Sequence, residues 1–171
     1  MADRTVESSD VQVPEIPEVL ESVLLYTLEE AKEKMSQGAD VVPFTALVVK
    51  DNLFIESHPG NTADECFNLA RHTVEHARGA SAYALCYDGY IDVDDEQRDA
   101  LIAEGGVPGA DAGYAVGYLY SVDAEGTVTF EDEAAYIGEA PNFMIALGSA
   151  DQYADADIDE KYLDDGAEDA E

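Results

Sequence analysis

The chain has 171 residues and a mass of 18.4 kDa, enough for one domain. It carries 39 acidic residues against 8 Lys and Arg, a formal net charge of −31, although 46% of its residues are hydrophobic. A surface of this charge would repel nucleic-acid phosphates and anionic lipids, and no apolar run is long enough to cross a membrane. We therefore expect no direct nucleic-acid partner and no membrane partner. The first residues lack the features of a secretory signal, which favours a cytoplasmic location.

The acidity is spread over the whole chain. Residues 1–21 and 151–171 contribute part of the excess, and the residues between them are acidic in their own right. An Asp-rich, Lys-poor composition is typical of a surface in a salt-rich cytoplasm, and it also occurs in ordinary acidic proteins. Cys66 and Cys86 stand outside any C-x-x-C arrangement, so we expect two buried free thiols.

Composition divides the chain into three parts. Residues 1–13 show no periodicity and are expected to form a mobile arm. Residues 14–150 have the apolar content of a single folded domain. From residue 151 to residue 171, acids alternate with alanine, which predicts a disordered acidic tail because so few side chains there could pack.

The domain is predicted to begin with a helix and a hairpin. Apolar residues recur at three- and four-residue steps from Ile16 to Met35, which predicts a helix over residues 14–37. A β-branched run at 41–49 predicts a strand, and a short turn leads to a second strand at 53–56.

A second helix is predicted over residues 62–78. Thr62 and Glu65 fit the capping box, in which each side chain satisfies a free backbone N–H at the start of the helix. Its apolar arc contains several alanines together with Phe67 and Val74, and its histidines lie on the opposite side.

Residues 81–93 and 114–120 are predicted strands with one aromatic and one small face each. Tyrosines alternate along both segments with Ala, Gly and other small residues. We expect the alanine-rich helix 62–78 to pack on the small face. The helix over 14–37 is then expected to cover the tyrosine face.

Three further segments complete the predicted sheet. Residues 94–106 have features of both a helix and a strand, and the strand is the favoured interpretation. Val122 and the run 127–130 are predicted to form a hairpin around an Asp-Ala-Glu-Gly turn. The apolar run 143–147 predicts a last strand.

Tyrosine is the residue type that most suggests a binding surface. The chain contains ten Tyr and no Trp, and tyrosine suits a binding surface because its ring is apolar while its hydroxyl needs a partner. The candidate binding residues are Tyr83, Tyr87, Tyr114, Tyr118 and Tyr120. A homodimer interface or a ligand groove would use such a patch, and the alternative is that a helix covers it.

One catalytic signature occurs, at residues 72–76. His72, Glu75 and His76 form an H-x-x-E-H pattern, which resembles the zinc motif of the inverzincin peptidases. In that family both histidines bind metal and the glutamate activates water. The resemblance covers five residues, and a solvated helix face is the favoured interpretation.

The acid-rich stretch 88–96 does not match a calcium-binding loop. Counted from Asp92, Gln97 stands where an EF-hand needs glycine, and Ala103 stands where it needs a bidentate glutamate. No glycine-rich phosphate loop and no G-x-S-x-G elbow occurs either. We therefore expect no cofactor, no catalytic residue and no metal site.

The sequence thus predicts an α+β domain with an antiparallel or mixed sheet of about five strands and two main helices packed on it. The favoured function is that of a non-enzymatic cytosolic interaction protein, which binds a protein partner or a second copy of itself. One alternative is a DNA mimic whose carboxylates occupy a basic nucleic-acid-binding partner. Another is a metal-dependent hydrolase that uses His72 and His76.

Overall fold

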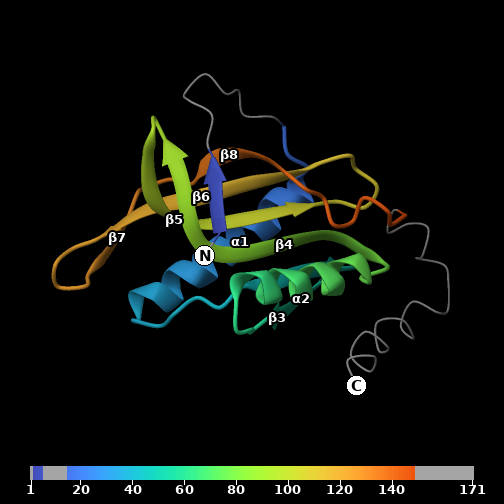
Figure 1. The fold of residues 1–171 in the computed structure, drawn as a ribbon. Coiled ribbons are helices and arrows are strands. Elements are labelled where there is room, and N and C mark those ends of the chain that lie inside the picture. The colour runs from blue at the N-terminus through green and yellow to red at the C-terminus, as the bar shows by residue number, and fades with distance from the viewer. Residues whose placement is uncertain (1, 6–14, 149–171) are drawn as a thin grey trace.

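The computed structural model describes residues 2–5 and 15–148, which form two helices and an eight-stranded sheet (Figure 1). The helices are α1 (Glu18–Ser36) and α2 (Ala63–Glu75). The strands are β1 (Ala2–Thr5), β2 (Phe44–Val49), β3 (Asn52–Ser57), β4 (Ala80–Val93), β5 (Glu96–Gly106), β6 (Gly113–Val122), β7 (Val128–Phe130) and β8 (Ala135–Ala140). The predicted α+β class with two helices packed on a sheet is confirmed, but the sheet has more strands than the expected five or so.

The strands are ordered β3-β2-β4-β5-β6-β7, and each neighbouring pair on this path is antiparallel. The parallel strand β1 pairs with β4 beyond the stretch that pairs with β2. On the far side of the sheet, β8 pairs with the first half of β6 and β7 with its second half. The strand β3 therefore forms one lateral edge of the sheet.

The long hairpin of β4 and β5 is the centre of the sheet. Its register runs from Tyr83 opposite Gly106 to Val93 opposite Glu96. Asp94 and Asp95 form the turn with φ values of 51° and 67°, as a tight two-residue hairpin requires. The strand interpretation of residues 94–106 is thus confirmed, and the aspartates that could also have begun a helix make the turn instead.

The start of α2 shows the predicted capping interaction. The Thr62 hydroxyl accepts a hydrogen bond from the Glu65 N–H at 3.1 Å. The Glu65 carboxylate reaches back to the N–H of Asn61 at 3.0 Å, one residue earlier than in the usual box. Backbone donors at this helix end are satisfied locally, which explains why its start could be predicted from a few adjacent residues.

The two helices cover opposite faces of the sheet (Figure 1), and the predicted assignment of helices to faces was wrong. α1 lies on the face with the alanines of β4, and α2 lies on the face with Tyr83 and Tyr87. The core between α1 and the sheet includes Leu20, Leu24, Leu28, Ala46, Ala82, Ala84 and Cys86. The core between α2 and the sheet includes Ala70, Val74, Tyr83, Leu85, Tyr87 and Ile102.

Volume explains this assignment. The leucines of α1 need the space that alanines on β2 and β4 leave, whereas the alanines of α2 leave space for tyrosine rings. The rings of Phe67 on α2 and Tyr87 on β4 pack edge-to-face with centroids 5.0 Å apart. Matching small with small would have left voids on one face of the sheet and crowding on the other.

The last strand of the sheet is not the one that the sequence predicted. Residues 143–147 form consecutive turns, in which the Asn142 side chain accepts a hydrogen bond from the Met144 N–H at 2.9 Å. Strand β8 precedes them and was missed. It pairs with β6 across a register shift between Ala115 and Val116, so its pattern is irregular.

Two predictions concern the ends of the chain. Residues 2–5 of the expected arm form β1, and the remainder of that segment lies outside the described residues. The acidic segment 151–171 also lies outside them. Within the described parts of the chain, neither helix is both long and apolar enough to cross a membrane.

Candidate functional sites

The five candidate tyrosines do not share one face of the sheet. Tyr83 and Tyr87 lie on the face that α2 covers. Tyr114, Tyr118 and Tyr120 lie on the face under α1. Strand β5 lies between β4 and β6, and its register with both decides which face the tyrosines of each strand occupy. Alternation within a single strand cannot reveal this relation. The expected common aromatic patch is therefore not formed.

The hydroxyl groups of Tyr83 and Tyr87 on β4 have hydrogen-bond partners inside the protein. The Tyr83 hydroxyl donates to the Pro141 carbonyl at 3.2 Å and accepts from the Phe143 N–H at 3.0 Å. Burial raises the pKa of Tyr83. The Tyr87 hydroxyl donates to the buried Glu104 carboxylate at 2.5 Å. These contacts tie the segment after β8 and the interior of β5 to β4, which is a structural role.

The tyrosines of β6 lie nearer to solvent. The Tyr120 hydroxyl donates to the Asp88 carboxylate at 2.6 Å, and burial raises the pKa of both groups. Tyr118 is 9% exposed and lines a cavity, while Tyr114 is half-buried. A binding role for these residues stays a prediction, and Tyr118 is the one with a cavity beside it.

The H-x-x-E-H residues lie on the exposed side of α2 and directly after it. The rings of His72 and His76 are 4.2 Å apart, and His76 Nδ1 is hydrogen-bonded to the His72 carbonyl at 2.8 Å. Glu75, which would have to activate water, is paired with Arg71 at 2.8 Å. Over residues 2–5 and 15–148, no group of three or more His, Cys, Asp or Glu is placed to hold a metal ion.

The outer strand β3 is an exposed apolar edge that the sequence analysis did not single out. All six of its residues are exposed, and the exposed fractions of Leu53, Phe54 and Ile55 are 38%, 49% and 46%. Soluble proteins usually protect such edges with charges, bulges or short strands. Only Glu56 is charged in β3, and its register with β2 has no shift. Three consecutive apolar residues, without alternation, were the available signal.

The other outer strands are better protected. β7 has three residues and β1 has four. β8 is interrupted by a register shift in its pairing with β6. Short length and bulges limit the pairing of an edge with another chain. Among the described strands, β3 therefore offers the longest regular and apolar edge.

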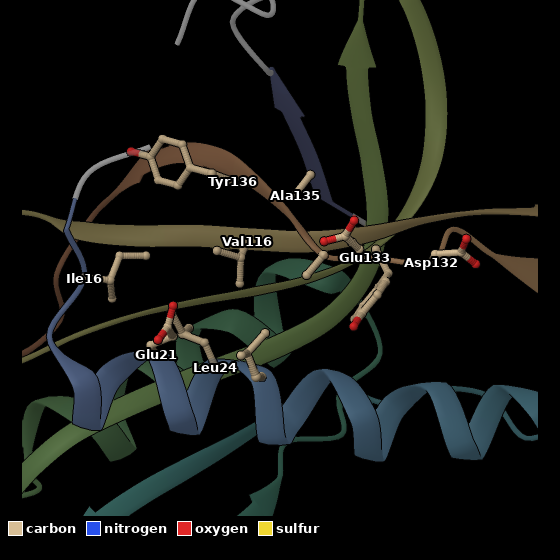
Figure 2. Close-up of a pocket in the computed structure, with 11 residues that line it drawn as sticks. Ile16, Glu21, Leu24, Val116, Asp132, Glu133, Ala135 and Tyr136 are labelled. Carbon is tan, nitrogen blue, oxygen red and sulfur yellow. The ribbon is translucent and has the colours of Figure 1, made fainter. Parts of the chain in front are cut away.

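A cavity of about 390 Å³ lies between α1, β6 and the segment that leads into β8 (Figure 2). Figure 2 shows Glu21 and Leu24 on α1, Val116 on β6, and Glu133 before β8 around this space. Its apolar lining comes from Ile16, Leu24, Leu25, Val116, Tyr118, Ala134, Ala135 and Tyr136. These residues come from distant parts of the chain, so no local motif pointed to the cavity.

The two thiols are buried and free, as predicted. Burial raises the pKa of Cys86 to about 12, and its Sγ contacts the Thr27 carbonyl at 3.6 Å. A thiol with such a pKa is protonated at neutral pH and is a poor nucleophile. Cys86 is therefore a packing residue.

Comparison with known proteins found no matching family model, no similar curated protein and no similar solved structure. The functional argument for this chain therefore depends on its own geometry.

Proposed function

We propose that the protein is a self-associating interaction protein, in which the β3 strands of two copies pair antiparallel and join the two sheets. The exposed apolar edge of β3 is the observation that supports this proposal. Pairing would remove Leu53, Phe54 and Ile55 from water and would satisfy backbone groups that now meet solvent.

The direction of the backbone groups in β3 follows from its neighbour. The His58 N–H donates to the Pro43 carbonyl at 2.8 Å, which continues the ladder between β2 and β3. Along a strand of an antiparallel pair, residues whose N–H and C=O point toward the partner strand alternate with residues whose N–H and C=O point away from it. Phe54 and Glu56 therefore direct their N–H and C=O toward β2. Leu53 and Ile55 direct theirs to the open edge.

A second copy suits this edge because the strand is complementary to itself. In an antiparallel register centred on Phe54, the two Phe54 rings are neighbours and Leu53 lies opposite Ile55 of the second copy. The same register places Asn52 opposite Glu56. Apolar residues thus face apolar residues, and the carboxylate faces an amide rather than another carboxylate.

The net charge opposes this association. Two copies at −31 each repel one another, and added salt screens that repulsion. A six-residue edge also buries less surface than a permanent dimer usually needs. We therefore expect a dimer whose population rises with protein concentration and with NaCl.

Sedimentation velocity over a range of protein and NaCl concentrations tests the proposal. Ile55→Pro removes an N–H that points away from β2, and Leu53→Lys places a charge on the edge. Both variants should be monomeric while their circular dichroism stays that of the parent protein. Ile145→Lys is the matched control, since Ile145 is 52% exposed and lies outside β3.

The control should associate as the unmodified protein does. A parent protein that stays monomeric under every condition would contradict the proposal, as would a dimer that survives both β3 substitutions.

The alternatives have less geometric support. A hydrolase built on His72 and His76 would need a third ligand, and the described residues place none beside them. It would also need Glu75 to be free of Arg71. The DNA-mimic alternative rests on acidity alone and stays a prediction.

A further inference from the structure

We propose that the cavity between α1, β6 and the segment before β8 binds an organic cation with an apolar body, such as an alkylammonium ion. This site is separate from β3, so the inference does not depend on self-association.

The cavity has the size of a small-ligand site. Its volume of about 390 Å³ lies within the range of roughly 300–1,000 Å³ that is typical of such sites. Leu24 and Tyr118 line it and are buried. Leu24 and Val116 place apolar side chains beside the space (Figure 2). A ligand with methyl or methylene groups would cover this apolar surface.

Charge selects the kind of ligand. Glu21 on α1 and the neighbouring Asp132 and Glu133 bring three carboxylates to the cavity. Among the residues that the structure describes, no Lys, Arg or His lines it. An anionic ligand would be repelled, and a neutral ligand would gain nothing from the carboxylates. A cation would be attracted by all three.

An aromatic ring adds a second preference for cations. The Lys32 ammonium group lies 4.0 Å from the centroid of the Tyr118 ring and occupies one face of it, so a ligand cation would use the other ring of the lining. Tyr136 also lines the cavity, and no Lys or Arg in the described parts of the chain lies over its ring. Burial, with the Glu29 and Glu133 carboxylates nearby, raises the pKa of Tyr118 and keeps its hydroxyl protonated.

The first experiment compares choline with 3,3-dimethylbutan-1-ol, which has the same shape without the charge. Both would be titrated at constant ionic strength and followed by NMR shifts of residues around the cavity. We expect choline to bind at least about tenfold more tightly than the alcohol. Equal binding of the two probes, or no binding of choline, would overturn the proposal.

The second experiment separates the cavity from the overall charge. Asp132→Asn combined with Glu133→Gln removes two carboxylates from the cavity. Asp111→Asn combined with Glu125→Gln removes two from exposed positions that do not line it. The first pair should weaken choline binding about tenfold, and the second should leave it unchanged. Equal losses would show that choline responds only to net charge and would overturn the proposal.

Discussion

His58 is a buried imidazole at the end of β3, where its Nε2 is hydrogen-bonded to the Thr45 hydroxyl at 2.8 Å. Burial lowers its pKa from 6.5, and the Glu56 carboxylate at 4.0 Å offsets part of that effect. The unfolded chain therefore takes up the proton first as the pH falls. We expect the free energy of unfolding to decrease below pH 6.5, by at most about 1.4 kcal/mol per pH unit.

Urea unfolding between about pH 7.5 and pH 5.5 measures this dependence. His58→Gln should remove the slope over that range. His72→Gln should retain it, because His72 is exposed on α2. The explanation fails if the His58 variant loses stability with falling pH as steeply as the parent protein does.

Single residues could be predicted from the sequence where their partners are close in the chain. Thr62 and Glu65 are three residues apart, and their capping interaction forms as expected. Tyr87 and Tyr118 were expected on one surface and lie on opposite faces, because their relation depends on the register of β5 with both neighbouring strands. Interactions between residues close in the chain could be predicted from the sequence. Which face of the sheet each strand's tyrosines occupy relative to those of another strand could not.

The packing of α1 on the sheet gives a prediction for the small face. Ala84 is fully buried in the centre of β4, under the leucines of α1. Ala84→Leu should crowd this interface and lower the free energy of unfolding by about 1–3 kcal/mol. Denaturant midpoints would measure the loss.

Ala124→Leu is the matched control for this substitution. Ala124 is exposed in the turn between β6 and β7, so an additional side chain there meets solvent. Its midpoint should stay close to that of the parent protein. If Ala84→Leu were equally harmless, α1 could not lie as closely on β4 as the structure shows.

A strand could be predicted from the sequence where its apolar pattern and the adjoining turn both indicated a hairpin. Residues 96–106 form a strand because the turn of Asp94 and Asp95 lets them pair directly with β4. The run 143–147 is equally apolar but forms turns, and it pairs with none of the described strands. An apolar segment becomes a strand only where the fold places it beside a free strand edge, and that is a property of the assembled fold.

Across the molecule, the excess of carboxylates gives a salt dependence. Cations such as Lys32, Arg71 and Arg98 each have a carboxylate partner, but 8 Lys and Arg cannot neutralise 39 acids. Mutual repulsion opposes compaction, and its range shrinks to about 8 Å at physiological ionic strength. We expect the melting temperature to rise by several degrees over the first few tenths molar of NaCl.

Melting curves in NaCl and KCl at equal ionic strength test this prediction. Screening depends on ionic strength and little on the identity of the ion, so both salts should give the same rise. A flat response would contradict the prediction. A rise with one salt alone would indicate binding of a particular ion instead.

The two candidate sites, the cavity and the edge of β3, depend on how the elements of the whole molecule are arranged. The cavity joins α1, β6 and the segment before β8, which are far apart in the chain. β3 is an edge because β2 pairs with one side of it and no other described strand pairs with its outer side. Neither site has a motif, and both required the complete arrangement of elements to be recognised.

The opposite coverage of the sheet by α1 and α2 also determines the redox chemistry of the chain. Cys66 lies on α2, and Cys86 on β4 faces α1, so the sheet itself stands between the two thiols. A disulfide needs Cα atoms within about 7 Å, which this arrangement denies them. We therefore expect both thiols to stay free in the folded chain under oxidising as well as reducing conditions.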